Sequence, residues 1–177
     1  GVLIPPSEFI DMADEAGMVD QIDLLVLRQA VAVICATNQR TGRRLSISSN
    51  LSANHFKGFE IVGTIKEILK TTGLPADLLV LEITETSELS DWSQVGRVIG
   101  ALKKLGCRIS IDDFGTGYSS LGYLTKFDID TLKIDRSFVN DIGSSKQSEL
   151  ITKTIIEMAK SLNFSVCAEG VETHEQA

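Results

Sequence analysis

The apolar positions follow two periodicities that alternate along the chain. Apolar residues at helical spacing predict helices over residues 7–16, 20–37, 59–72, 91–105, 119–126 and 146–162. Short alternating or apolar runs predict strands over residues 45–52, 78–85, 108–113, 128–134 and 164–169. The apolar stripe expected for the second helix consists of Ile22, Leu25, Val26 and Ala30. Five units of a strand followed by a helix favour parallel strands in a single α/β domain.

Each predicted strand ends in a polar or ionisable residue on one of its faces. These residues are Asn50, Glu82, Asp112, Lys133 and Glu169. The opposite face of each strand is apolar, as at Ile109 and Ile111, because strand side chains alternate in direction. A doubly wound sheet buries both faces under helices, whereas a closed barrel has two unlike faces and collects its strand ends at one mouth. The pattern favours a barrel with a site at that mouth; the alternative is a set of solvated strand ends in turns.

The strand ends predict a cation site that acts on a phosphodiester. Oxygen ligands are present at Asn50, Glu82, Asp112 and the adjoining Asp113. Such ligands suit magnesium, manganese or calcium, and two ions would relieve the repulsion between carboxylates and activate a water. Lys133 is expected to orient that water or offset phosphate charge, and Glu169 to bind metal or to act with Lys133 as proton acceptor. A receiver domain uses similar residues, but there the lysine ends the last strand, whereas here Lys133 follows the acidic pair by one short unit.

Composition and charge exclude several classes of protein. The chain has 177 residues, of which 43% are hydrophobic, and a net charge of −7, so neither disorder nor a polymeric nucleic-acid partner is expected. No apolar run approaches the roughly 20 residues that span a bilayer, so no direct membrane insertion is expected. Cys35, Cys107 and Cys167 are expected to be free core thiols in a reducing compartment. The chain has two histidines, His55 and His174, both in polar surroundings, and so few histidines and cysteines argue against a zinc site.

Five segments in order carry a resemblance to a known family. They are ISSNLSANHF (47–56), LEITET (81–86), IDDFGTGYSSLGYL (111–124), LKIDRSFV (132–139) and AEGVET (168–173). Together with PPSEFIDMADEAGMV near the start, they closely resemble the EAL-domain phosphodiesterases, bacterial enzymes that hydrolyse cyclic di-GMP to linear pGpG. The resemblance implies a TIM-type (β/α)8 barrel of the EAL type, here incomplete, with about five βα units after two N-terminal helices.

The resemblance also implies roles for individual residues. Its metal ligands correspond to Asn50, Glu82, Asp112 and, for a second ion, Asp113. Lys133 and Glu169 resemble the catalytic pair around the attacking water. Glu85 resembles a glutamate that anchors the loop after Asp113, and Glu172 resembles a supporting carboxylate.

The cofactors, partners and location implied by the family are also expectations at this stage. The resemblance implies two Mg²⁺ or Mn²⁺ ions, cyclic di-GMP as substrate, and a homodimer formed through the loop after Asp113. It implies a cytoplasmic location, either of the whole protein or of the cytoplasmic part of a membrane-anchored sensor.

The chain departs from the family pattern in one respect. The tripeptide Glu-Ala-Leu that names the family and the Gln-Gly-Tyr segment that closes it are both absent. We therefore expect residues 1–177 to be a single EAL-type domain truncated at both ends. The alternative function is a non-catalytic cyclic di-GMP receptor or interaction module. A Glu-x-Leu-x-Arg motif upstream of Gly1 would favour the enzyme.

Overall fold

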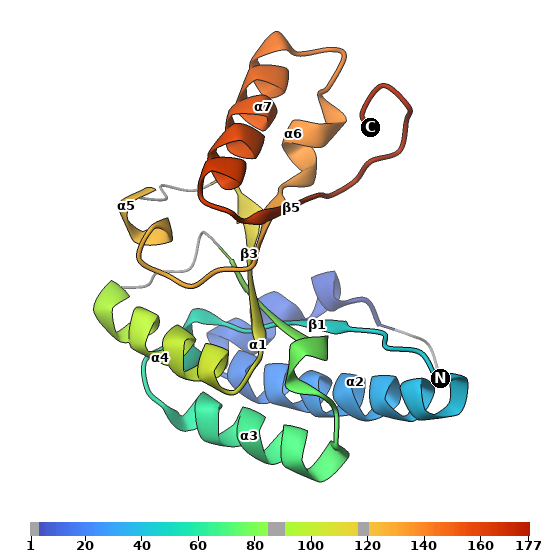
Figure 1. The fold of residues 1–177 in the computed structure, drawn as a ribbon, viewed down its shortest axis with the longest axis vertical. Helices are drawn as coiled ribbons and strands as arrows, with labels where there is room; N and C mark the ends of the chain where they lie inside the picture. The colour runs from blue at the N-terminus through green and yellow to red at the C-terminus, as the bar shows by residue number, and fades with distance from the viewer. Residues whose placement is uncertain (1–3, 85–90, 117–120) are drawn as a thin grey trace.

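The computed structural model describes residues 4–84, 91–116 and 121–177 (Figure 1). Its helices are α1 (Ile10–Glu15), α2 (Val19–Thr41), α3 (Glu60–Thr72), α4 (Trp92–Lys104), α5 (Leu121–Leu124), α6 (Arg136–Asn140) and α7 (Lys146–Ser161). Three short 3₁₀ helices are η1 (Pro6–Glu8), η2 (Ala53–Phe56) and η3 (Ala76–Leu78). The strands are β1 (Ile47–Asn50), β2 (Leu79–Thr84), β3 (Arg108–Phe114), β4 (Thr131–Ile134) and β5 (Ser165–Ala168).

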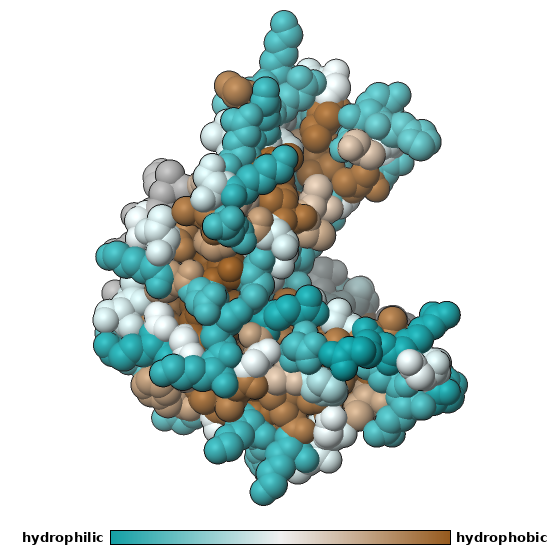
Figure 2. Space-filling model, in the orientation of Figure 1, coloured by the Kyte–Doolittle hydropathy of each residue, from teal (hydrophilic) through white to brown (hydrophobic). Residues whose placement is uncertain are grey.

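The five strands form one parallel sheet in the order of the sequence, β1-β2-β3-β4-β5. Each strand therefore pairs with its neighbour in the chain, as in a (β/α)8 barrel. Among the described residues β1 and β5 form the two edges, and Figure 2 shows the molecule hollowed on one side, between the part that contains α6 and α7 and the part that contains α2. The expected fold, an incomplete barrel of five βα units, is confirmed.

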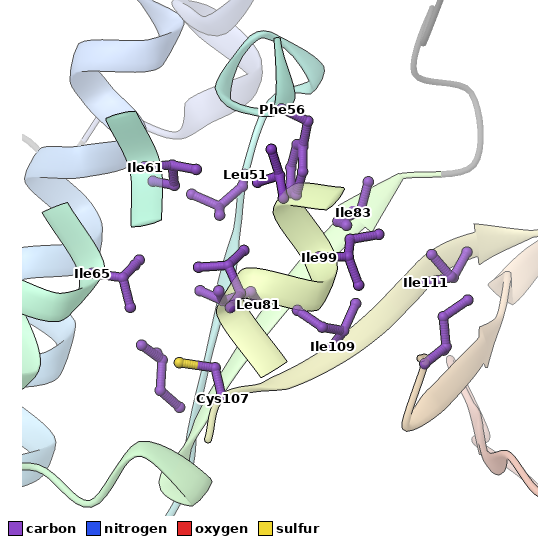
Figure 3. Close-up of a cluster of buried hydrophobic side chains, with 14 of the residues drawn as sticks. Leu51, Phe56, Ile61, Ile65, Leu81, Ile83, Ile99, Cys107, Ile109 and Ile111 are labelled. Carbon is purple, nitrogen blue, oxygen red and sulfur yellow. The ribbon is translucent and has the colours of Figure 1, made fainter. Parts of the chain in front are cut away.

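The helix-facing side of the central strands forms the core (Figure 3). Its members on β2, β3 and β4 are Leu79, Leu81, Ile83, Ile109, Ile111, Leu132 and Ile134, all buried. Ile61 and Ile65 of α3 and Ile99 of α4 pack against them from the helices. The two-residue period of the strands thus places one face under the helices and leaves the other face to form the interior of the open barrel.

Two sequence predictions about burial are wrong, and one helix was not predicted. The buried stripe of α2 is Leu27, Val31 and Cys35, whereas Leu25 and Val26 are more than half exposed. Apolar residues surround most of this helix, so its sequence periodicity did not define a single face, and contacts with β1 and α3 decided which side is buried.

The other two errors concern the carboxyl-terminal half. Cys167 is exposed, because it lies on the edge strand β5, although Cys35 and Cys107 are buried as expected. Helix α6 was not predicted, because only five residues form it and one turn gives little periodicity.

No helix in the described parts of the chain combines the length and the apolar character needed to cross a bilayer.

Asp130 ties the starts of three strands together before they reach the mouth. Its carboxylate accepts the Ile109 N–H of β3 at 2.7 Å and lies 2.6 Å from the Lys103 ammonium of α4. Its own N–H donates to the Ile109 carbonyl, and its carbonyl accepts from the Ser165 N–H of β5. Since Ile109 is fully buried, its N–H has no access to water if this acceptor is lost.

We expect Asp130→Ala to lower the free energy of unfolding by about 1–3 kcal/mol, because it leaves the buried Ile109 N–H without an acceptor. Asp128→Ala is the matched control, since Asp128 is exposed and lies 3.9 Å from the same lysine. Its loss should stay below about 1 kcal/mol. Urea denaturation measures both, and equal losses would contradict the role given to Asp130.

Candidate active site

The Lys133 ammonium lies among three carboxylates at the carboxyl ends of the strands. Its Nζ is 3.1 Å from Glu82 Oε2 of β2, 2.9 Å from Asp112 Oδ1 of β3 and 2.6 Å from Oε1 of Glu169, which directly follows β5. The lysine side chain is 15% exposed, and those of Glu82 and Asp112 are about as buried. Four residues predicted from four different strand ends therefore meet at one place.

A β-bulge brings the two adjacent aspartates to the same site. On β3 and β4, Ile111 pairs with Leu132 and Phe114 pairs with Ile134, so Asp112 and Asp113 together lie opposite the single residue Lys133. Asp113 adopts the left-handed conformation, with φ of 53°, and its N–H donates to Asp112 Oδ1 at 3.0 Å. Aspartate is one of the few non-glycine residues that tolerate this conformation.

The bulge overrides the alternation of side chains along the strand. In a regular strand Asp112 and Asp113 would point to opposite faces. Instead, carboxylate oxygens of Asp112, Asp113 and Glu169 all lie within 4.8 Å of one another. Such a group of oxygen ligands fits a hard divalent cation, because the charge of the ion offsets the repulsion among the carboxylates.

Hydrogen bonds keep Lys133 charged. Burial by itself lowers the pKa of a lysine, but the hydrogen bonds of Lys133 to Glu169, Asp112 and Glu82 outweigh burial and raise its pKa above the ordinary value. At neutral pH the side chain is therefore a cation that donates hydrogen bonds and cannot accept a proton from water.

The surroundings that favour the charged form of Lys133 disfavour the charged form of Asp113. Burial raises the pKa of Asp113 above its usual value, and the neighbouring charges of Asp112, Asp135 and Glu169 raise it further. Without a cation beside it, the charged form of Asp113 is therefore less favourable than that of an ordinary aspartate. It shares a hydrogen bond with Asp135, in which the more acidic Asp135 accepts.

Asp135 is a member of the site that the sequence analysis missed. It follows β4 directly and caps α6, where its Oδ1 accepts the Ser137 N–H at 2.9 Å. The hydrogen bonds from Ser137 lower the pKa of Asp135, which keeps it negative next to Asp113. Its position in the sequence could have identified it, because Asp135 lies two residues after Lys133 and directly follows a strand whose end was already assigned to the site.

The remaining predicted residues lie outside this cluster of charges. Asn50 pairs with Glu82 in the β1–β2 register and is exposed at the same mouth. Glu172 is exposed in the segment after β5, where its N–H donates to Gln176 Oε1. Glu85 lies outside the described residues, so its anchoring role stays a prediction, as does the supporting role of Glu172.

Known proteins are similar to this chain over nearly its whole length. The chain is 42% identical over 176 residues to the signaling protein YkoW of Bacillus subtilis and 40% identical over 174 residues to the cyclic di-GMP phosphodiesterase NbdA of Pseudomonas aeruginosa. The alignments include 99% and 98% of this chain, respectively. The chain spans about a fifth of these relatives, 22% of each.

Solved structures resemble both the fold and the sequence. The PaMucR phosphodiesterase in its c-di-GMP complex superposes with a TM-score of 0.91 at 35% identity, over 98% of this chain and 70% of that one. Klebsiella pneumoniae BlrP1, in a complex with manganese and cyclic di-GMP, gives a TM-score of 0.81 at 32% identity, over 97% and 43% of the two chains. The EAL domain model matches residues 1–177, so the chain belongs to the EAL domain family.

Proposed function

We propose that this domain hydrolyses cyclic di-GMP to linear pGpG in a reaction that depends on two Mg²⁺ or Mn²⁺ ions. The observation that carries the proposal is the group formed by Lys133 and the carboxylates of Glu82, Asp112 and Glu169, next to Asp113. The relative NbdA is named a cyclic di-GMP phosphodiesterase, and the PaMucR and BlrP1 structures contain cyclic di-GMP, in BlrP1 together with manganese.

The proposed cation ligands are Asn50, Glu82, Asp112 and Asp113, with Glu169 beside them. When bound, the ions would lower the pKa of the attacking water and offset negative charge on the phosphodiester. Asp112 would be a central ligand, because a carboxylate oxygen of this residue lies within 4.8 Å of ligand atoms of Asp113 and Glu169, and its Oδ1 is 2.9 Å from Lys133 Nζ. The paired-ion arrangement rests on this donor set and on the family.

Lys133 and Glu169 have different roles in the proposed reaction because their charges are opposite. Lys133 stays protonated, so its ammonium orients Glu169 and attracts the anionic phosphodiester, while the Glu169 carboxylate is the group of the pair that can accept a proton from water. Since Lys133 Nζ also contacts Glu82 and Asp112, the same ammonium fixes three carboxylates at the mouth before substrate binds.

The other expectations that follow from the family are proposals as well. We propose a homodimer that involves the loop after Asp113, of which residues 117–120 lie outside the described structure. A cytoplasmic location is supported by the three cysteines, all of which are free thiols. The activity is proposed for the complete domain that contains residues 1–177.

We expect Glu169→Gln to lower kcat for cyclic di-GMP hydrolysis by about 10²–10⁴-fold, because the amide keeps the shape of the side chain but cannot accept the proton. The measurement is a turnover assay on the full-length protein with Mn²⁺, and chelation with EDTA should abolish turnover in the wild type. Glu175→Gln is the control, since Glu175 is a fully exposed glutamate away from the site.

Unchanged turnover in Glu169→Gln would refute the role of Glu169. Tight binding of cyclic di-GMP by a wild-type protein that shows no turnover would instead favour the receptor alternative.

We expect Asp113→Asn to separate stability from cation binding. The raised pKa of Asp113 means that its negative charge is unfavourable in the folded, cation-free protein, and this cost applies at every pH above that pKa. Asparagine removes the charge and also tolerates the left-handed conformation. The variant should therefore be more stable than the wild type in EDTA at pH 7 and should bind Mn²⁺ more weakly.

Urea denaturation in EDTA and a Mn²⁺ titration provide the two measurements. Asp128→Asn is the control, because this aspartate is exposed and precedes β4; it should not raise the stability in EDTA and should leave Mn²⁺ binding unchanged. A loss of stability in Asp113→Asn at pH 7 without cation would contradict the electrostatic account.

A further inference from the structure

A second group of ligating side chains lies outside the proposed active site. Asp20 and Asp23, in the first turns of α2, come together with His55 of η2. One ligand atom from each of the three lies within 4.8 Å of the others. The two aspartates are three residues apart, so they share a face of α2, and that face meets the loop that follows Asn50.

His55 is the unusual member of this group. Its side chain is 8% exposed, and no described residue gives its buried Nε2 a hydrogen bond of good geometry. Asp23 Oδ2 lies 3.3 Å from this nitrogen. A buried ring nitrogen that faces a carboxylate without a hydrogen bond is costly, and a proton or a metal ion between them would relieve it.

The two aspartates also lack a basic partner. None of the ion pairs between described residues brings a lysine or an arginine to Asp20 or Asp23. Asp20 Oδ1 accepts the Ser52 hydroxyl at 2.5 Å and Asp23 Oδ2 accepts the Ser52 N–H at 2.8 Å. A carboxylate oxygen has two lone pairs, so Asp23 Oδ2 can accept this hydrogen bond and still offer a lone pair toward His55 Nε2, 3.3 Å away.

We propose that Asp20, Asp23 and His55 form a binding site for a divalent transition metal of the zinc type. Imidazole nitrogen and carboxylate oxygen are both ligand types that zinc accepts, and a water would complete four-fold coordination. Two ligands of a tetrahedral zinc ion, each at about 2.0–2.1 Å, are separated by about 3.3–3.4 Å, which matches the 3.3 Å distance from His55 Nε2 to Asp23 Oδ2.

The site differs in chemistry from the proposed active site. The group around Asp112 offers only oxygen atoms and therefore suits Mg²⁺ or Mn²⁺, whereas the imidazole of His55 favours zinc. A metal held by Asp20, Asp23 and His55 cross-links α2 to the loop directly after Asn50. It thus fixes the position of β1 from outside the barrel, and its role is structural.

The histidine content of the chain provides a matched control. The protein has two histidines, and the second, His174, is exposed near the carboxyl terminus. His55→Gln removes the nitrogen ligand, whereas His174→Gln removes a histidine that takes no part in the site. Both variants leave every residue of the proposed active site in place.

The test is the stoichiometry of Zn²⁺ binding in equilibrium dialysis, with millimolar Mg²⁺ present to occupy the oxygen-only site. We expect the wild type and His174→Gln each to bind one equivalent of Zn²⁺. The His55→Gln variant should bind this equivalent more than about tenfold more weakly. Replacing Zn²⁺ with Co²⁺ should give the strong visible absorption of a four-coordinate nitrogen and oxygen site in the same two proteins.

One further measurement and one further variant make each outcome decisive. Circular dichroism in EDTA checks the fold of His55→Gln, and Asp20→Asn, which keeps His55, replaces it as the test variant if His55→Gln does not fold. Equal Zn²⁺ binding by the wild type and the test variant would overturn the proposal. Because no turnover is measured, failure here is distinct from failure of the proposed hydrolysis.

Discussion

The repulsion among carboxylates at the mouth of the sheet, and its relief by Lys133, is the constraint on which the site depends. Glu82, Asp112 and Glu169 come from three different parts of the chain, and parallel strand order alone makes their side chains converge. One ammonium contacts all three at hydrogen-bonding distance. The same hydrogen bonds outweigh burial and raise the pKa of Lys133, so the charge of Lys133 and the order of the carboxylates depend on each other.

One cation does not balance the whole site. Asp113 and Asp135 add two more carboxyl groups, and the raised pKa of Asp113 reflects the excess of negative charge in a partly buried place. A protein that keeps such a group carries a cost in stability that a bound divalent cation can offset. The bulge at Asp112 and Asp113 also carries a cost in stability, because Asp113 is a non-glycine residue in the left-handed conformation. This conformation turns the Asp113 carboxylate toward the other carboxylates of the site.

The sequence predicted the order and type of the main elements because their periods are strong. The helices α3, α4 and α7 and the strands β2 and β3 lie within one or two residues of their predicted bounds. Each strand also ends in a polar residue on the face opposite its apolar face. This pattern was sufficient to select Glu82, Asp112, Lys133 and Glu169 as a group. Predictions failed where the local pattern was ambiguous, as in α2, or where the element was too short to show a period, as in α6.

The sequence by itself determined which side chains reach the mouth, because alternation along a parallel strand is a local property of the backbone. Only the tertiary structure decided how they meet. The bulge that turns Asp113 toward Asp112 depends on the pairing of β3 with β4, and the burial of His55 beside Asp23 depends on α2 packing against a loop about thirty residues away in the chain. Both arise from contacts between distant segments, and the local periodicity of the sequence carries no information about such contacts.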